Sequence, residues 1–108
     1  MHTSAALAAL ATTALCGALA VPAIARSPKT ATVTLKDISF KKATVKIARG
    51  GTVTWTWKDG STPHNVTFAH RHSGTKKTGT YKMTFPKAGT FTYHCTIHPG
   101  MNGKVVVG

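Results

Sequence analysis

The sequence contains a thiolate, two imidazoles and a thioether that could bind one metal ion together. Cys95, His98 and Met101 lie in the short segment 95–101, and His64 follows Pro63 much earlier in the chain. Thiolate and thioether are soft ligands that suit copper, and a trigonal His₂Cys site with a weak axial Met is typical of copper electron-transfer centres. The four side chains therefore predict one copper ion that alternates between Cu(I) and Cu(II).

A zinc enzyme is the main alternative for this spacing, because Cys-x₂-His also occurs in zinc sites. A catalytic zinc keeps an open position for water, whereas Met101 would fill that position here. The two acidic residues, Asp37 and Asp59, lie too far from the motif along the chain to predict a general base. We therefore expect an electron-transfer protein without substrate turnover rather than an enzyme.

Residues next to the four ligands could orient them. Asn65 and Thr96 each follow a ligand directly, and such neighbours often hydrogen-bond to metal ligands. An equally good interpretation is that both are ordinary polar turn residues. Pro63 and Pro99 would stiffen the two ligand segments, and Gly100 would permit a tight return before Met101.

The remaining histidines and one methionine have simpler interpretations. Strand alternation turns His94 away from Cys95, which predicts a surface histidine. His70 and His72 could form an adventitious Cu(II) or Zn(II) site, but a solvated loop is favoured because Arg71 between them repels cations. Met83 is expected to pack in the core.

The elements that must position these residues are strands. In 52–57, Val53, Trp55 and Trp57 share one face and threonines the other, a period-two pattern typical of a half-buried strand. Both tryptophans are expected in the core, with an aromatic docking platform as the alternative. Similar extended stretches occur at 32–35, 38–40, 43–47, 65–68, 80–85, 90–95 and 103–107. Seven or eight short strands without a helical pattern predict an all-β sandwich.

The first 25 residues differ from the rest of the chain. They contain no charged side chain, are mostly apolar from Ala5 to Val21, and end in the small-x-small sequence 23–25. This pattern predicts a signal peptide at 1–25, a polar lead-in at 26–30 and one domain at 31–108. An uncleaved membrane anchor is the alternative, but Gly17 and Pro22 interrupt the apolar run. We expect export to the periplasm, the cell envelope or the medium.

Cleavage of this leader would remove Cys16 and leave Cys95 as the only cysteine. No internal disulfide could then stabilise the small domain, and a bound metal becomes a natural candidate for that role. Taken alone, Cys95 would be interpreted as a small buried hydrophobic residue.

The chain is strongly basic, with 14 Lys and Arg against 2 acidic residues and a net charge of +12. Such a field favours anionic partners, so we expect redox partner proteins with acidic docking surfaces, with an anionic envelope surface as a second kind of partner. Nucleic acid is not an expected partner of an exported chain. We expect the protein to be a monomer. The lysines are also dispersed along the chain, which favours the interpretation that most of them lie on the solvated outer faces of strands.

Three segments resemble small type-1 (blue) copper proteins of the plastocyanin/amicyanin group of cupredoxins. They are Pro-His-Asn-Val at 63–66, Tyr-His-Cys-Thr-Ile-His-Pro-Gly-Met at 93–101 and Gly-Lys-Val-Val-Val at 103–107. The resemblance implies a Greek-key β-sandwich and a copper ion held by His64, Cys95, His98 and Met101. It also implies that His98, within an apolar patch, is the port for electrons. The basic charge departs from the acidic patches of many plastocyanins.

The sequence thus predicts an exported one-electron carrier with a mononuclear copper site. One alternative is a copper-handling protein of the cell envelope that delivers or buffers the ion. A second alternative is a cationic surface-binding module whose metal site is structural.

Overall fold

The computed structural model describes residues 27–108, so the predicted signal peptide at 1–25 lies outside the described residues. The seven strands are β1 (Thr30–Lys36), β2 (Ser39–Lys41), β3 (Thr44–Ile47), β4 (Gly51–Trp57), β5 (Thr80–Phe85), β6 (Gly89–His94) and β7 (Asn102–Val107). Within 27–108, no helix is long and apolar enough to cross a membrane. The all-β class predicted from the sequence is confirmed.

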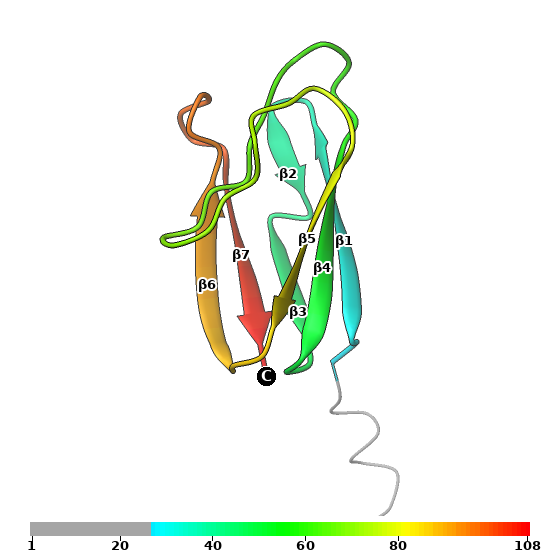
Figure 1. Cartoon of the computed structure of the whole chain (residues 1–108), viewed down its shortest axis with the longest axis vertical. Helices are drawn as coiled ribbons and strands as arrows, with labels where there is room; N and C mark the ends of the chain where they lie inside the picture. Colours follow the sequence, from blue (N-terminus) through cyan, green and yellow to red (C-terminus); the bar gives the residue numbers. More distant parts are fainter. Residues whose placement is uncertain (1–26) are drawn as a thin grey trace, which may run out of the picture.

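The strands form two sheets that lie opposite one another (Figure 1). One sheet has the order β2-β1-β4-β5, and the other has the order β3-β7-β6. Two pairs, β1 with β4 and β3 with β7, are parallel and join strands that are distant in sequence, whereas the other neighbours are antiparallel. The chain therefore crosses between the sheets, as in the predicted Greek-key β-sandwich.

The core lies between the sheets and is built around β4. Val53, Trp55 and Trp57 are buried and the intervening threonines are half-buried, as the alternation predicted. The Trp55 ring packs edge-on against Phe68 and Tyr93, with centroids 5.7 and 5.3 Å apart. The expected core role of both tryptophans is confirmed, and the core supplies a rigid support for the segments beyond the strand ends.

One expected strand, 65–68, is absent from the two sheets. Its backbone instead pairs with several segments, because Thr67 forms isolated bridges with both His72 and His94. Asn65 directs its backbone N–H towards the Cys95 sulfur rather than towards a neighbouring strand. Residues 65–68 are thus held between neighbouring segments at the end of the sandwich that carries the predicted metal ligands, here called the metal end. They do not add a strand to either sheet.

The segments that carry the predicted ligands lie at one end of the sandwich. β4 ends at Trp57 and is followed by the long connection 58–79, while the turn 95–101 joins β6 to β7. Figure 1 shows the turn 95–101 and the two ends of the connection 58–79 at the end opposite the C-terminus, while the middle of that connection runs down along the sandwich. Residues from distant parts of the sequence therefore meet there.

Candidate metal centre

The fold brings three of the four predicted ligands together. The ligand atoms of His64, Cys95 and His98 all lie within 4.8 Å of one another. Met101 is buried at the end of the same turn, where its carbonyl accepts the Cys95 N–H at 3.0 Å and its own N–H donates to the His98 carbonyl at 3.1 Å. Gly100, at φ +84°, supplies the left-handed backbone that this tight return requires.

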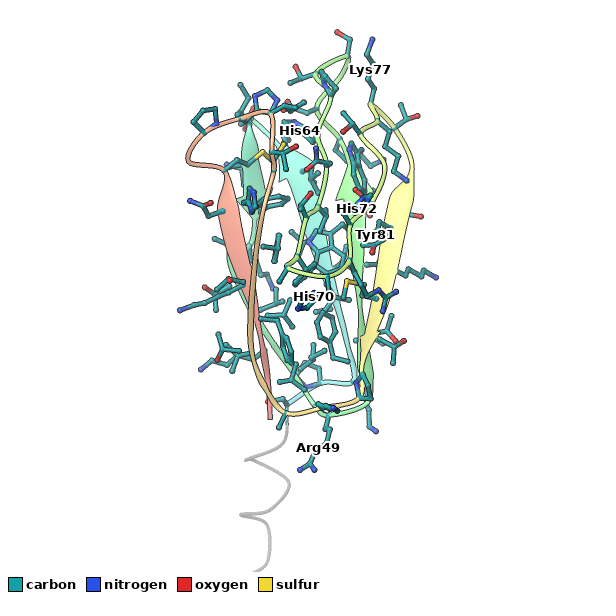
Figure 2. The ribbon with its side chains drawn as sticks, turned by 60° about the vertical axis from the view of Figure 1, so that its left-hand side comes forward. Arg49, His64, His70, His72, Lys77 and Tyr81 are labelled. Atoms are coloured by element: carbon teal, nitrogen blue, oxygen red, sulfur yellow. The ribbon has the colours of Figure 1, made fainter. Side chains whose placement is uncertain are left out.

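His64 is fully buried, and its two ring nitrogens have different surroundings. Nε2 lies 2.7 Å from the Asp59 carboxylate, so it carries the proton and donates it. Nδ1 is buried without a hydrogen-bond partner among residues 27–108. A buried, unpaired nitrogen is costly, and a metal ion on Nδ1 would remove that cost. Figure 2 shows His64 at the end of the sandwich far from Arg49.

His98 is held in the same way as His64, through its Nε2. Its Nε2 donates to the Pro63 carbonyl at 2.9 Å, which leaves the lone pair on Nδ1. The His64 and His98 rings are 4.7 Å apart at their centroids and tilted by 56°. His98 is half-buried and is the more exposed of the two imidazoles.

The buried Cys95 thiol is connected to the His64 segment by Asn65. The Asn65 backbone N–H points at Cys95 Sγ at 3.5 Å. The Asn65 side chain donates to the Thr96 hydroxyl at 2.7 Å and accepts the Thr96 N–H at 3.0 Å. Both neighbours singled out in the sequence therefore join the two ligand segments, which favours an orienting role over that of ordinary turn residues.

Asp59 is the site residue that the sequence did not predict. Its distance from the motif along the chain gives no reason to expect it at the site, whereas the structure places it against His64. Its carboxylate also accepts the N–H groups of Asp37 and Ile38, both at 3.0 Å. The Ile38 N–H, the His64 imidazole and the Asp37 N–H lower the pKa of Asp59, so the carboxylate is ionised at neutral pH.

The turn that holds Asp59 has an unusual backbone. Asp37 and Ile38 have φ values of +54° and +52°, a left-handed conformation that is rare for a β-branched residue. Their two N–H groups converge on one carboxylate, which compensates for the strain. The sequence shows Asp37 and Asp59 as its two acidic residues, but nothing in it indicates that the Asp59 carboxylate contacts the turn at Asp37.

The other candidate residues stay outside the centre. His70, His72 and His94 are exposed, as expected, and none belongs to the cluster of His64, Cys95 and His98. Figure 2 shows His70 and His72 away from His64 along the sandwich. Met83 is buried in the core.

Comparisons with known proteins agree with this geometry. A family model described as copper binding proteins, plastocyanin/azurin family, matches residues 29–108. Amicyanin-alpha of Methylorubrum extorquens is 38% identical over 113 residues, covering 96% of this chain and 94% of that protein. Amicyanin of Paracoccus denitrificans is 39% identical over 83 residues, covering 69% of this chain and 63% of that protein. The chain thus matches less than two thirds of the Paracoccus protein's length.

Solved structures show the same relationship. A reduced amicyanin mutant superposes with a TM-score of 0.65 at 36% identity, covering 73% of this chain and 82% of that one. A purple cupredoxin from Nitrosopumilus maritimus reaches a TM-score of 0.67 at 26% identity, covering 72% of this chain and 99% of that one. With a family match over nearly all of the described residues, the chain belongs to the plastocyanin/azurin family of copper-binding proteins.

Proposed function

We propose that the protein is a one-electron carrier whose single copper ion is held by His64, Cys95, His98 and Met101. Copper supplies the redox chemistry when bound, by alternating between Cu(I) and Cu(II). The observation that carries the proposal is the buried Nδ1 of His64, which has no hydrogen-bond partner in 27–108 and lies in a cluster with a thiol and a second imidazole. Two relatives of this chain are amicyanins.

The residues of the site act by holding a fixed geometry. Asp59 orients the His64 ring, the Pro63 carbonyl orients the His98 ring, and Asn65 holds the Cys95 thiolate in place by its N–H. A site held in this way needs little rearrangement between oxidation states. Burial keeps solvent away from the Cys95 and Met101 side chains, which supports a carrier without catalytic turnover.

The same burial argues against copper delivery. A protein that hands its ion to a partner needs ligands that the partner can reach, whereas His64, Cys95 and Met101 are each at most 3% exposed. The electron carrier is therefore favoured over the copper-handling alternative.

Location and partners form a further part of the proposal. The apolar leader at 1–25 supports export to the periplasm or cell envelope, and the net charge of +12 supports monomeric action on redox proteins with acidic docking surfaces. An N-terminal sequence of the protein purified from its host would test the predicted cleavage after Ala25.

Copper titration followed by visible and EPR spectroscopy tests the function. We expect an intense blue thiolate-to-copper band with a narrow hyperfine splitting, bleached by a mild reductant and lost in Cys95→Ser. Met101→Leu is the matched control, because loss of a weak axial ligand should retain the thiolate band. A colourless tetragonal Cu(II) spectrum that is unchanged in Cys95→Ser would contradict the proposal.

A further inference from the structure

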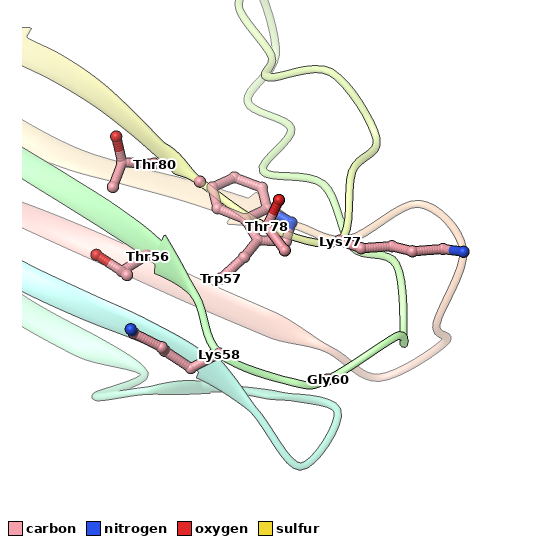
Figure 3. Close-up of a pocket in the computed structure, with 8 residues that line it drawn as sticks. Thr56, Trp57, Lys58, Gly60, Lys77, Thr78 and Thr80 are labelled. Carbon is pink, nitrogen blue, oxygen red and sulfur yellow. The ribbon is translucent and has the colours of Figure 1, made fainter.

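A hollow of about 450 Å³ opens beside the metal end, between the segment that follows β4 and the segment that precedes β5. Trp57, Lys58 and Gly60 line it from one side, and Lys77 and Thr78 line it from the other. Figure 3 shows Trp57 between the two lysines, whose side chains extend in different directions. Figure 2 places Lys77 at the same end of the sandwich as His64.

The surroundings of the hollow are cationic. Lys58 and Lys77 are exposed, and the Lys76 ammonium lies 4.6 Å from the centroid of the Trp57 ring. The sequence has only two acidic residues, and the nearer one, Asp59, already binds His64 and two backbone N–H groups. Lys58, Lys76 and Lys77 therefore lie around the hollow, and none of them pairs with a carboxylate among residues 27–108. This corner should attract an anionic surface.

Trp57 connects the hollow to the metal centre. Its indole Nε1–H donates to the His64 carbonyl at 2.9 Å. His64 and Lys76 also exchange two backbone hydrogen bonds, each of 3.0 Å. One hydrogen bond thus separates an aromatic ring that lines the hollow from the backbone of a predicted copper ligand.

We propose that the lysine-rimmed hollow at Trp57 is a docking site for the acidic surface of a one-electron redox protein, with Trp57 as the bridge to His64. The inference rests on the proposed function. It identifies one face of the protein at which electrons are exchanged with a partner, separate from the exposed edge of His98. One electron passes from the reduced site to the oxidised centre of the partner, which is reduced as the site is oxidised. No bond or proton is transferred, and Trp57 acts as a positioning residue.

The first test needs no copper. Hexacyanochromate(III), a paramagnetic and redox-inactive trianion, is added to the metal-free protein, and NMR line broadening is recorded. We expect broadening of the Trp57 indole N–H and of the Lys58 and Lys77 amides. The variant Lys58→Glu/Lys77→Glu should lose it, whereas Lys46→Glu/Lys87→Glu, with the same charge change on exposed residues away from the hollow, should retain it.

The second test follows electron transfer in the copper-loaded protein at low ionic strength. Lys58→Glu/Lys77→Glu should slow oxidation by hexacyanoferrate(III) at least about tenfold relative to the Lys46/Lys87 control pair. A cationic oxidant such as tris(phenanthroline)cobalt(III) should not be slowed. Trp57→Phe should slow hexacyanoferrate(III) while the broadening by hexacyanochromate(III) persists.

The occupant is tested by competition. Poly-glutamate should displace hexacyanochromate(III) from the hollow at much lower carboxylate concentration than inorganic phosphate requires. Equal displacement by phosphate would indicate a small-anion site and overturn the proposal. Line broadening centred on other lysines would also overturn it. So would equal rates of oxidation by hexacyanoferrate(III) in the Lys58/Lys77 and Lys46/Lys87 variants. Absence of a blue copper spectrum would contradict the proposed function and with it the electron-transfer role of the hollow. It would leave the anion-binding result in place, because the NMR experiment is independent of copper.

Discussion

The Asp59 carboxylate accepts a 2.7 Å hydrogen bond from Nε2 of His64. The same carboxylate accepts the N–H groups of Asp37 and Ile38, so the β1–β2 turn and the imidazole share one anchor. This arrangement selects the ring tautomer of His64 and leaves Nδ1 as the nitrogen available to a metal.

Replacing Asp59 with Asn should weaken copper binding. The amide has one acceptor oxygen and no charge, so it cannot hold the imidazole and both turn N–H groups together. We expect the Cu(II) affinity to fall by about 10–100-fold, measured by competition with a chelator. Asp37→Asn makes the same charge change at an exposed residue whose carboxylate lies 3.9 Å from Lys41, and an equal loss there would contradict the role given to Asp59.

Asn65→Ala should destabilise the fold. The substitution removes a side chain that binds Thr96 through two hydrogen bonds and also accepts the Thr67 hydroxyl at 2.8 Å. We expect a loss of about 1–3 kcal/mol in the free energy of unfolding, measured by urea denaturation of the metal-free protein. The same substitution at the exposed Asn102 should cost much less, and equal losses would argue against the hydrogen-bond network.

Tyr93 should make stability fall at alkaline pH. Burial raises the pKa of Tyr93 to about 12, although the nearby Trp55 indole offsets part of the effect. Between pH 10 and 12 the unfolded chain loses a proton that the folded chain retains. The contribution is therefore fully present below pH 10 and is lost as the pH rises through 12, by up to about 3 kcal/mol.

Tyr93→Phe tests this expectation. The Tyr93 hydroxyl is buried without a hydrogen-bond partner in 27–108, so its removal should not lower stability at neutral pH. Unfolding free energies near pH 9 and near pH 12 should differ less in this variant than in the parent protein. Tyr81→Phe is the control variant. It keeps the same lysines, so their titration cancels when the two variants are compared, and its stability should change with pH as in the parent protein.

Gly103→Ala should destabilise the sandwich through steric overlap. A Cβ at this position would overlap the Tyr93 ring, and Tyr93 is held by Trp55 and Phe40 at centroid distances of 5.3 and 4.7 Å. Overpacking of this kind costs about 1–3 kcal/mol, measurable by thermal unfolding. Gly74→Ala, where a Cβ would meet open space, should be nearly neutral.

Much of the fold was predictable because it depends on local patterns. Alternation in 52–57 and 80–85 determines which side chains face the core, and turn residues separate the strands. The segment 65–68 has the same alternation but does not join a sheet, because its polar groups bind Cys95, Thr96 and Thr75 instead. Local pattern carries no information about such competing partners.

The amino-acid sequence by itself determined which ligand set to predict, since only Cys95, His98 and Met101 with an earlier histidine combine soft and imidazole donors at this spacing. Only the tertiary structure decided that Asp59 contacts His64 and that Trp57 joins the lysine hollow to it. The ligand types and their spacing along 95–101 are local properties of the chain. The approach of Asp59, the β1–β2 turn and His64 depends on the parallel pairing of β1 with β4, a long-range contact that residue types do not specify.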